Sequence, residues 1–135
     1  MKSFDVQAID LNLPRNKALA FIADPAQLPR WTNAFASVTS GRALMRTPGG
    51  EVMIDHQVEA SPEHGTVDWR MIFPDRSVAT AFSRVVEINR DRCIFSFVLS
   101  PPPVPLEQLE GALDAQSRTL AEELKKLKEI LEHRA

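Results

Sequence analysis

A run of prolines followed by a long amphipathic segment constrains this fold more than any other feature of the sequence. Prolines stand at 101, 102, 103 and 105, and proline supplies no backbone donor for a sheet and disrupts a helix interior. The run therefore separates a strand-rich body from one C-terminal helix. That helix is predicted to cover the apolar face of a sheet. Its apolar stripe comprises Leu106, Leu109, Leu113, Leu120, Leu124, Leu127 and Leu131, with Glu, Lys and Arg at most other positions.

The middle of the leucine stripe carries small and polar residues, so Leu113 and Leu120 lack large apolar neighbours there. These residues are Gly111, Ala112, Ala115, Gln116 and Ser117. Protein interiors are close-packed, and a helix segment of this kind cannot fill a core by itself. The gap predicts either that another group fills the space or that a cavity is left.

Length and composition indicate one globular domain over residues 1–135. The chain has 44% apolar and 25% charged residues, which is ordinary for such a domain. A formal net charge of −2 provides no electrostatic surface for nucleic acid or an anionic membrane. No apolar run is long enough to span a bilayer and no secretion signal follows Met1, so we expect a cytoplasmic location. The lone Cys93 excludes an intramolecular disulfide and should pack as a small hydrophobe.

Hydrophobic alternation and breaker residues predict a strand, two short helices, about five further strands and then the long helix. The first strand is expected over 2–11. Helices should begin at Pro14 and after the capping residue Asp24. The later strands are expected over 39–46, 51–60, 66–73, 77–89 and 93–100.

This order, together with the stretches LPRNKALAFIAD (13–24) and LPRW (28–31), resembles the START and polyketide-cyclase superfamily, SRPBCC. The size is closest to its small bacterial stand-alone cyclase- or dehydratase-like members. The resemblance implies an α+β helix-grip fold, in which a curved antiparallel sheet of about six strands surrounds the C-terminal helix. It also implies a mostly apolar cavity between sheet and helix, which members use for lipids, sterols, polyketides, hormones or partner proteins.

Strand alternation assigns large apolar side chains to the wall of this cavity, because the face opposite the charged residues must look toward the helix. The strand residues expected there are Trp69, Met71, Phe73, Phe82, Phe95 and Phe97, and the helix residues are Leu109, Leu113 and Leu120. The alternative is that these side chains simply fill a solid core.

His56 is the sharpest polar candidate, because it shares a strand face with Ile54 and Val58 and is predicted to point inward. Its imidazole could donate a hydrogen bond to a ligand or act as a general acid or base. The alternative is a core histidine that bonds to a backbone carbonyl or water.

Arg84 and Gln116 are two further polar candidates. If Phe82 faces inward then Arg84 does too, and its guanidinium could hold a carboxylate or an enolate. The Val85-Val86 pair leaves the phase of this strand open, and it favours a solvated Arg84. Gln116 could orient a ligand through its amide or lie at the cavity rim.

Cofactor and metal motifs are missing from the sequence, so we expect neither group. His56, His64 and His133 are widely separated and no HxxxH or CxxC spacing occurs. No serine stands in a GxSxG elbow, and the Gly49-Gly50 pair is typical of a turn.

Two function classes follow, and the sequence favours the first. It is a binding protein that holds a small apolar, lipid- or polyketide-like molecule. The second is a cyclase- or dehydratase-type enzyme in which His56 or Arg84 transfers a proton or stabilises an enolate; such enzymes usually need a pair of cooperating polar groups. A lower-ranked third alternative is a co-chaperone-like interaction module. The protein is expected to be a monomer or a homodimer.

Overall fold

The computed structural model describes residues 4–47, 50–99 and 106–133, and at 47 and 106–112 it describes the backbone alone. Within these residues, seven antiparallel strands form one curved sheet in the order β1-β7-β6-β5-β4-β3-β2. The strands are β1 (Asp5–Leu11), β2 (Phe35–Thr39), β3 (Arg42–Thr47), β4 (Gly50–Ser61), β5 (Thr66–Ile72), β6 (Val78–Asn89) and β7 (Arg92–Leu99). The first and last strands of the sequence that enter this sheet, β1 and β7, are therefore neighbours.

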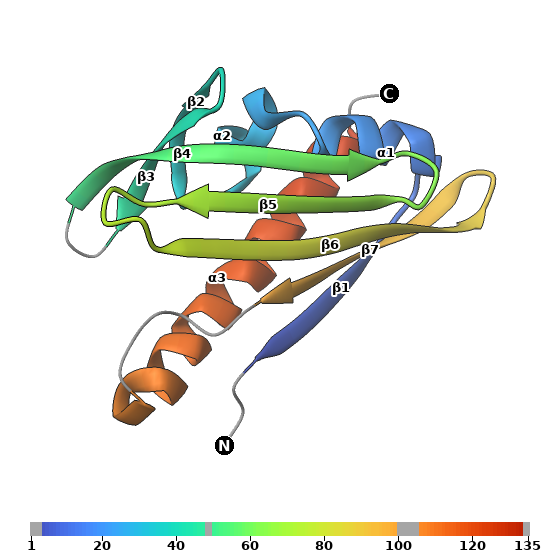
Figure 1. The fold of residues 1–135 in the computed structure, drawn as a ribbon. Coiled ribbons are helices and arrows are strands. Elements are labelled where there is room, and N and C mark those ends of the chain that lie inside the picture. Colours follow the sequence, from blue (N-terminus) through green and yellow to red (C-terminus); the bar gives the residue numbers. More distant parts are fainter. Residues whose placement is uncertain (1–3, 48–49, 100–105, 134–135) are drawn as a thin grey trace.

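The helices lie on one side of this sheet. After β1 the chain forms α1 (Arg15–Ile22), the 3-10 turn η1 (Pro25–Gln27) and the single-turn α2 (Leu28–Trp31). Asp24 caps η1, since its carboxylate accepts a hydrogen bond from the N–H of Ala26 at 3.1 Å. The long α3 (Leu106–Glu132) crosses the sheet steeply, with α1 and α2 near its C-terminal half (Figure 1).

The predicted α+β helix-grip fold is confirmed, with one correction to the strands. The prediction of a single strand over 39–46 was wrong, because two strands, β2 and β3, form a hairpin there. Ser40 and Gly41 make the turn, and Gly41 has a φ of 81°, in the left-handed region that favours glycine. Phe35 begins β2, the strand that was not predicted from the sequence.

The turn between β4 and β5 packs tightly against β6 and α1. Gly65 has a φ of 75°, its N–H donates to the carbonyl of Ser61 at 2.7 Å, and its own carbonyl accepts from the N–H of Val85 at 2.7 Å. A Cβ at Gly65 would lie 2.3 Å from the Val85 carbonyl oxygen. Arg15 of α1 donates to the carbonyls of Pro62 at 2.7 Å and Val85 at 3.3 Å. This turn therefore requires glycine.

The C-terminal half of α3 closes the core. Its buried leucines are Leu120, Leu124, Leu127 and Leu131, and they join one cluster that includes Leu11, Ile22, Leu28, Trp31 and Phe95. Cys93 is also fully buried in this cluster, as predicted, and burial, followed by the charge of Glu87, raises the pKa of its thiol.

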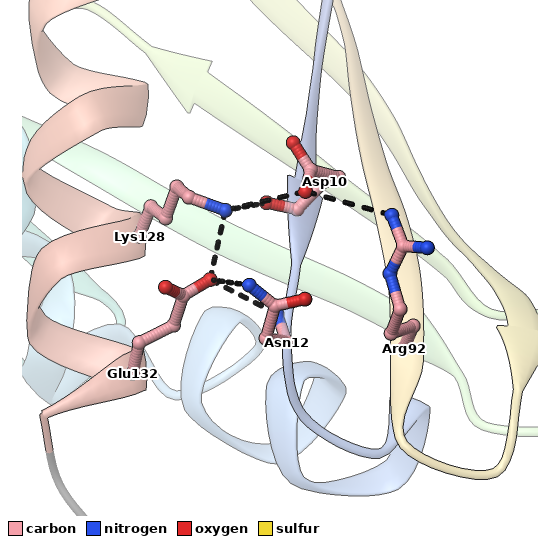
Figure 2. Close-up of polar contacts among 5 residues, drawn as sticks. All are labelled: Asp10, Asn12, Arg92, Lys128 and Glu132. Carbon is pink, nitrogen blue, oxygen red and sulfur yellow. Dashed lines mark hydrogen bonds and ion pairs between the residues drawn. The ribbon is translucent and has the colours of Figure 1, made fainter.

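A polar network fixes the last turns of α3 to the end of β1 (Figure 2). Lys128 donates to the carbonyl of Asp10 at 2.6 Å and pairs with Glu132 at 2.8 Å. Glu132 in turn accepts from the backbone N–H of Asn12 at 3.0 Å, and Arg92 of β7 lies 3.7 Å from Asp10. Burial lowers the pKa of Lys128, but Glu132 and Asp10 together raise it above its ordinary value. The network positions α3 relative to the sheet edge.

Candidate ligand-binding cavity

A cavity of about 420 Å³ opens between α3, the sheet and the segment that joins α2 to β2. This volume lies within the range of small-molecule sites in proteins. The main sheet residues of its wall are Trp69, Met71, Ala79, Ala81, Phe97 and Leu99. The residues from α2, β2, β3 and the segment between them are Leu28, Trp31, Thr32, Ala34, Phe35 and Met45. The α3 residues are Ala115, Gln116, Thr119, Leu120 and Glu123.

Aromatic rings build one wall of the cavity. Trp69 stacks on Phe97 with ring centroids 5.7 Å apart and planes inclined by 27°. Trp31 contacts Trp69 at 6.3 Å and meets Phe95 edge-on at 6.2 Å. The ring of Phe95 also meets that of Phe97 edge-on, with the centroids 6.3 Å apart. Each contact lies in the favourable range for aromatic pairs, so these rings support one another, and the stacked pair of Trp69 and Phe97 forms the aromatic part of the cavity wall.

Small residues on two elements leave the space that these rings face. On β6, Ala81 pairs with Trp69 and Ala79 pairs with Met71, so a short side chain stands beside each large one. On α3, Ala115 and Gln116 from the gap in the leucine stripe line the cavity. The part of the gap at Ala115 and Gln116 therefore lies at the cavity.

Ser117, the other polar residue of the gap, faces β1 instead. Its hydroxyl donates to the carboxylate of Asp5, and its carbonyl accepts from Gln7 Nε2 at 2.8 Å. The same amide nitrogen donates to Asp5 at 2.8 Å. Ser117 thus attaches the middle of α3 to β1 and contributes nothing to the cavity wall.

The structure brings half of the sequence-predicted site residues together in this cavity. These are Trp69, Met71, Phe73, Phe97, Gln116 and Leu120. Phe95 is buried behind the wall, in contact with Trp31 and Phe97. Leu113 is buried but does not line the cavity, and the side chain of Leu109 lies outside the described residues.

Phe82 and Arg84 are corrections, because both lie on the outer face of the sheet. Phe82 is 46% exposed, whereas Ser83 and Val85 are buried. The Ser83 hydroxyl donates to the carbonyl of Val67 at 2.6 Å, which leaves Arg84 on the solvent side, where it reaches the carbonyl of His64 at 3.2 Å. The register with β5 and β7 decides this phase. The solvated interpretation of Arg84 is the one that fits the structure.

His56 points inward, as predicted, but does not reach the cavity. Its side chain is 3% exposed and its ring lies 5.1 Å from that of Phe35, which does line the cavity. Nε2 has no hydrogen-bond partner within the described part of the chain. Burial alone lowers the pKa of His56. His56 is therefore part of the core and not of the cavity wall.

The sequence interpretation missed Glu123, the one acidic residue among the described residues of the cavity wall. It follows Gln116 by seven positions and Leu120 by three, so helical spacing places all three on one face. Its Oε2 accepts a hydrogen bond from the N–H of Asn33 at 2.6 Å. Burial raises the pKa of Glu123, against the opposing effects of that N–H and Lys126.

The contribution of the segment between α2 and β2 to the cavity wall was also missed. Arg46 of β3 donates to the carbonyl of Asn33 at 2.9 Å, so the Asn33 backbone is held by α3 on one side and by β3 on the other. Thr32 and Ala34, on either side of it, line the cavity. Only these long-range contacts bring the segment to the cavity wall.

Residues 4–47, 50–99 and 106–133 contain neither a metal site nor a membrane-spanning helix. There, no group of three His, Cys, Asp or Glu residues could hold a metal ion. No described helix combines the length and apolar character needed to cross a membrane.

Among known proteins, the matches to this chain are solved structures. No protein-family model and no curated protein matches the chain. A START superfamily protein from Mycobacterium smegmatis aligns with a TM-score of 0.73 at 12% identity, over 98% of this chain and 99% of its own.

Two cyclase structures align similarly well. The Zhui aromatase/cyclase from Streptomyces sp. R1128 gives a TM-score of 0.72 at 10% identity, over 97% of this chain and 94% of its own. The di-domain ARO/CYC BexL gives 0.69 at 18% identity, over 98% of this chain and 47% of its own. Identities this low establish the fold alone. The chain therefore has the START-like, or SRPBCC, helix-grip fold.

Proposed function

We propose that this protein binds a small, largely apolar molecule in the cavity between α3 and the sheet. The observation that carries the proposal is the cavity of about 420 Å³ with the stacked pair of Trp69 and Phe97 in its wall. An apolar site of this size with a few polar groups at its margin is the usual form of a small-molecule site. The similarity to the Zhui aromatase/cyclase and to the di-domain ARO/CYC BexL is consistent with it.

A cyclase-type reaction that uses His56 or Arg84 has less support from the geometry. A general acid or base must come within hydrogen-bond reach of the substrate. His56 lies behind Phe35 and Arg84 lies on the outer face. We therefore propose binding as the primary function, with one domain over residues 1–135 and no assigned catalytic residue.

Titration with N-phenyl-1-naphthylamine, a neutral dye that fluoresces in apolar surroundings, tests the proposal. The cavity-filling variant is Gln116→Phe, because Gln116 is exposed on α3 and lines the cavity. We expect it to weaken binding at least about tenfold, since the new ring occupies the site. Arg118→Phe is the matched control, with the same new ring on the same helix but outside the cavity wall.

Native mass spectrometry of the freshly purified protein provides the second readout, through a retained small molecule. Equal dye binding by the wild type and by both variants would contradict the proposal, as would the absence of saturable binding by the wild type. Thermal melting of both variants confirms that any loss of binding is not a loss of folding.

A further inference from the structure

Glu123 and Trp31 stand between the cavity and a second, outward-facing hollow. This outer hollow has a volume of about 360 Å³ and is lined by Trp31, Asn33, Glu123 and charged residues of α3. Both Trp31 and Glu123 also line the apolar cavity. Glu123 therefore lies where the wall of the apolar cavity meets the outer hollow.

One oxygen of this carboxylate is available to a ligand. Oε2 is engaged by the N–H of Asn33, and Oε1 has no hydrogen-bond partner among the residues that the structure describes. A carboxylate can accept about four hydrogen bonds in total and donates none when ionised. The other polar residues of the wall, such as Gln116, Thr32 and Thr119, can both donate and accept. The indole N–H groups of Trp31 and Trp69, which also line the cavity, only donate and have no hydrogen-bond partner among the described residues. Glu123 is thus the described wall residue whose ionised side chain only accepts, and it selects a ligand group that donates.

We propose that Glu123 is the polar anchor of the cavity, and that the ligand is a neutral, flat aromatic molecule whose hydroxyl group donates a hydrogen bond to the Glu123 carboxylate. This inference rests on the proposed binding function. The stacked pair of Trp69 and Phe97 complements a flat ring system. The free carboxylate oxygen complements a hydroxyl at its end.

Charge considerations favour a neutral hydroxyl over an ionic head group. A ligand carboxylate would meet Glu123 with the same charge. An ammonium head would have to leave water for a half-buried site, and the positive charge of Lys126 already acts on Glu123. Ion pairs formed with loss of solvation return little net free energy. A hydroxyl avoids both penalties and still gains a charge-assisted hydrogen bond.

The test compares 2-naphthol with 2-methoxynaphthalene by equilibrium dialysis. The two molecules share one ring system, and the methoxy compound has no donor and is the more apolar. The hydrophobic effect alone would favour 2-methoxynaphthalene, so a preference of the wild type for 2-naphthol reports the hydrogen bond. We expect 2-naphthol to bind about tenfold more tightly, as for a hydrogen bond to a charged acceptor.

Glu123→Gln is the informative variant, because its amide oxygen can still accept from Asn33 while its NH₂ group faces the ligand in place of an acceptor. We expect the two naphthalenes to bind this variant with affinities equal within about twofold. Glu122→Gln is the matched control, since Glu122 lines the outer hollow but not the cavity, and it should keep the wild-type preference.

Each outcome decides between the two proposals. Equal binding of both compounds by the wild type would refute the role of Glu123 while leaving the binding function intact, and so would a preference that survives Glu123→Gln. Binding of N-phenyl-1-naphthylamine with no binding of either naphthalene would also refute this inference alone. If none of the three compounds binds the wild type, the proposed function fails, and this inference fails with it.

Discussion

Phe95 and Phe97 offer a matched test of whether the space beside α3 is a true cavity. Both residues belong to β7, point to the same face of the sheet and contact each other at 6.3 Å. Phe95 is fully buried and Phe97 is partly buried at the cavity wall. The same substitution to alanine therefore removes the same atoms from a filled site and from a partly empty one.

The expected free energies of unfolding differ for this reason. Phe95→Ala leaves a new void among packed neighbours, and such changes lower the free energy of unfolding by about 3–5 kcal/mol. Phe97→Ala loses its stack on Trp69 and part of its apolar burial, for about 1–2 kcal/mol, because one side of its ring already lacks packed neighbours. Phe97→Ala should also change the affinity for N-phenyl-1-naphthylamine.

Urea denaturation followed by circular dichroism measures both quantities, provided the slope of the transition is unchanged. The difference between the two variants should be about 2 kcal/mol. Losses that agree within about 0.5 kcal/mol would show that Phe97 is packed as completely as Phe95, and would refute the assignment of a cavity at this wall.

Three further perturbations test the fold around the cavity. Gly65→Ala should lower the free energy of unfolding by more than about 2 kcal/mol, because it combines a left-handed φ with a Cβ 2.3 Å from the Val85 carbonyl; a melting temperature equal to the wild type would contradict this packing. Leu124→Asp should abolish cooperative thermal unfolding, since the charge would enter the core without a partner, whereas Glu122→Asp on the exposed face of α3 should have little effect. Burial lowers the pKa of His56 below its ordinary 6.5. As the pH falls, the imidazole therefore binds a proton in the unfolded chain before it does so in the folded protein. The free energy of unfolding should thus decrease below about pH 6.5, by up to about 1.4 kcal/mol per pH unit. In denaturant titrations, His56→Leu should not show this loss of stability at low pH. If wild type and variant have the same pH profile, His56 is not buried in its neutral form. The raised pKa of Glu123 changes stability with the opposite sign, but Glu123 is present in both proteins, so its effect cancels in their difference.

Local pattern was sufficient to predict much of the fold. The leucine stripe identified α3, and the alternation in β4 and β5 assigned Ile54, His56 and Trp69 to the inner face. These signals are strong because one face of each element is consistently apolar and the other is polar. The turn at Gly41 was missed because its flanking residues also suit a strand, so that the hairpin of β2 and β3 was interpreted as one element.

The composition of the cavity wall depended on contacts between distant parts of the chain. The phase of β6 could not be obtained from its own sequence, because Phe82, Val85 and Val86 place apolar groups on both faces. Pairing with β5 and β7 turns Ala81 inward and Phe82 outward. A strand pattern distinguishes two faces, but only the register with its neighbours decides which one looks toward the helix.

The sequence by itself determined that a long apolar-striped helix follows a strand-rich body, and that the stripe is interrupted in the middle. The tertiary structure alone decided that His56 is separated from the resulting cavity by Phe35, and that Glu123 stands at its wall beside the Asn33 backbone. Periodicity fixes the face on which a residue lies, because it follows from local backbone geometry. Which distant side chains share that face depends on how elements far apart in the sequence pack together.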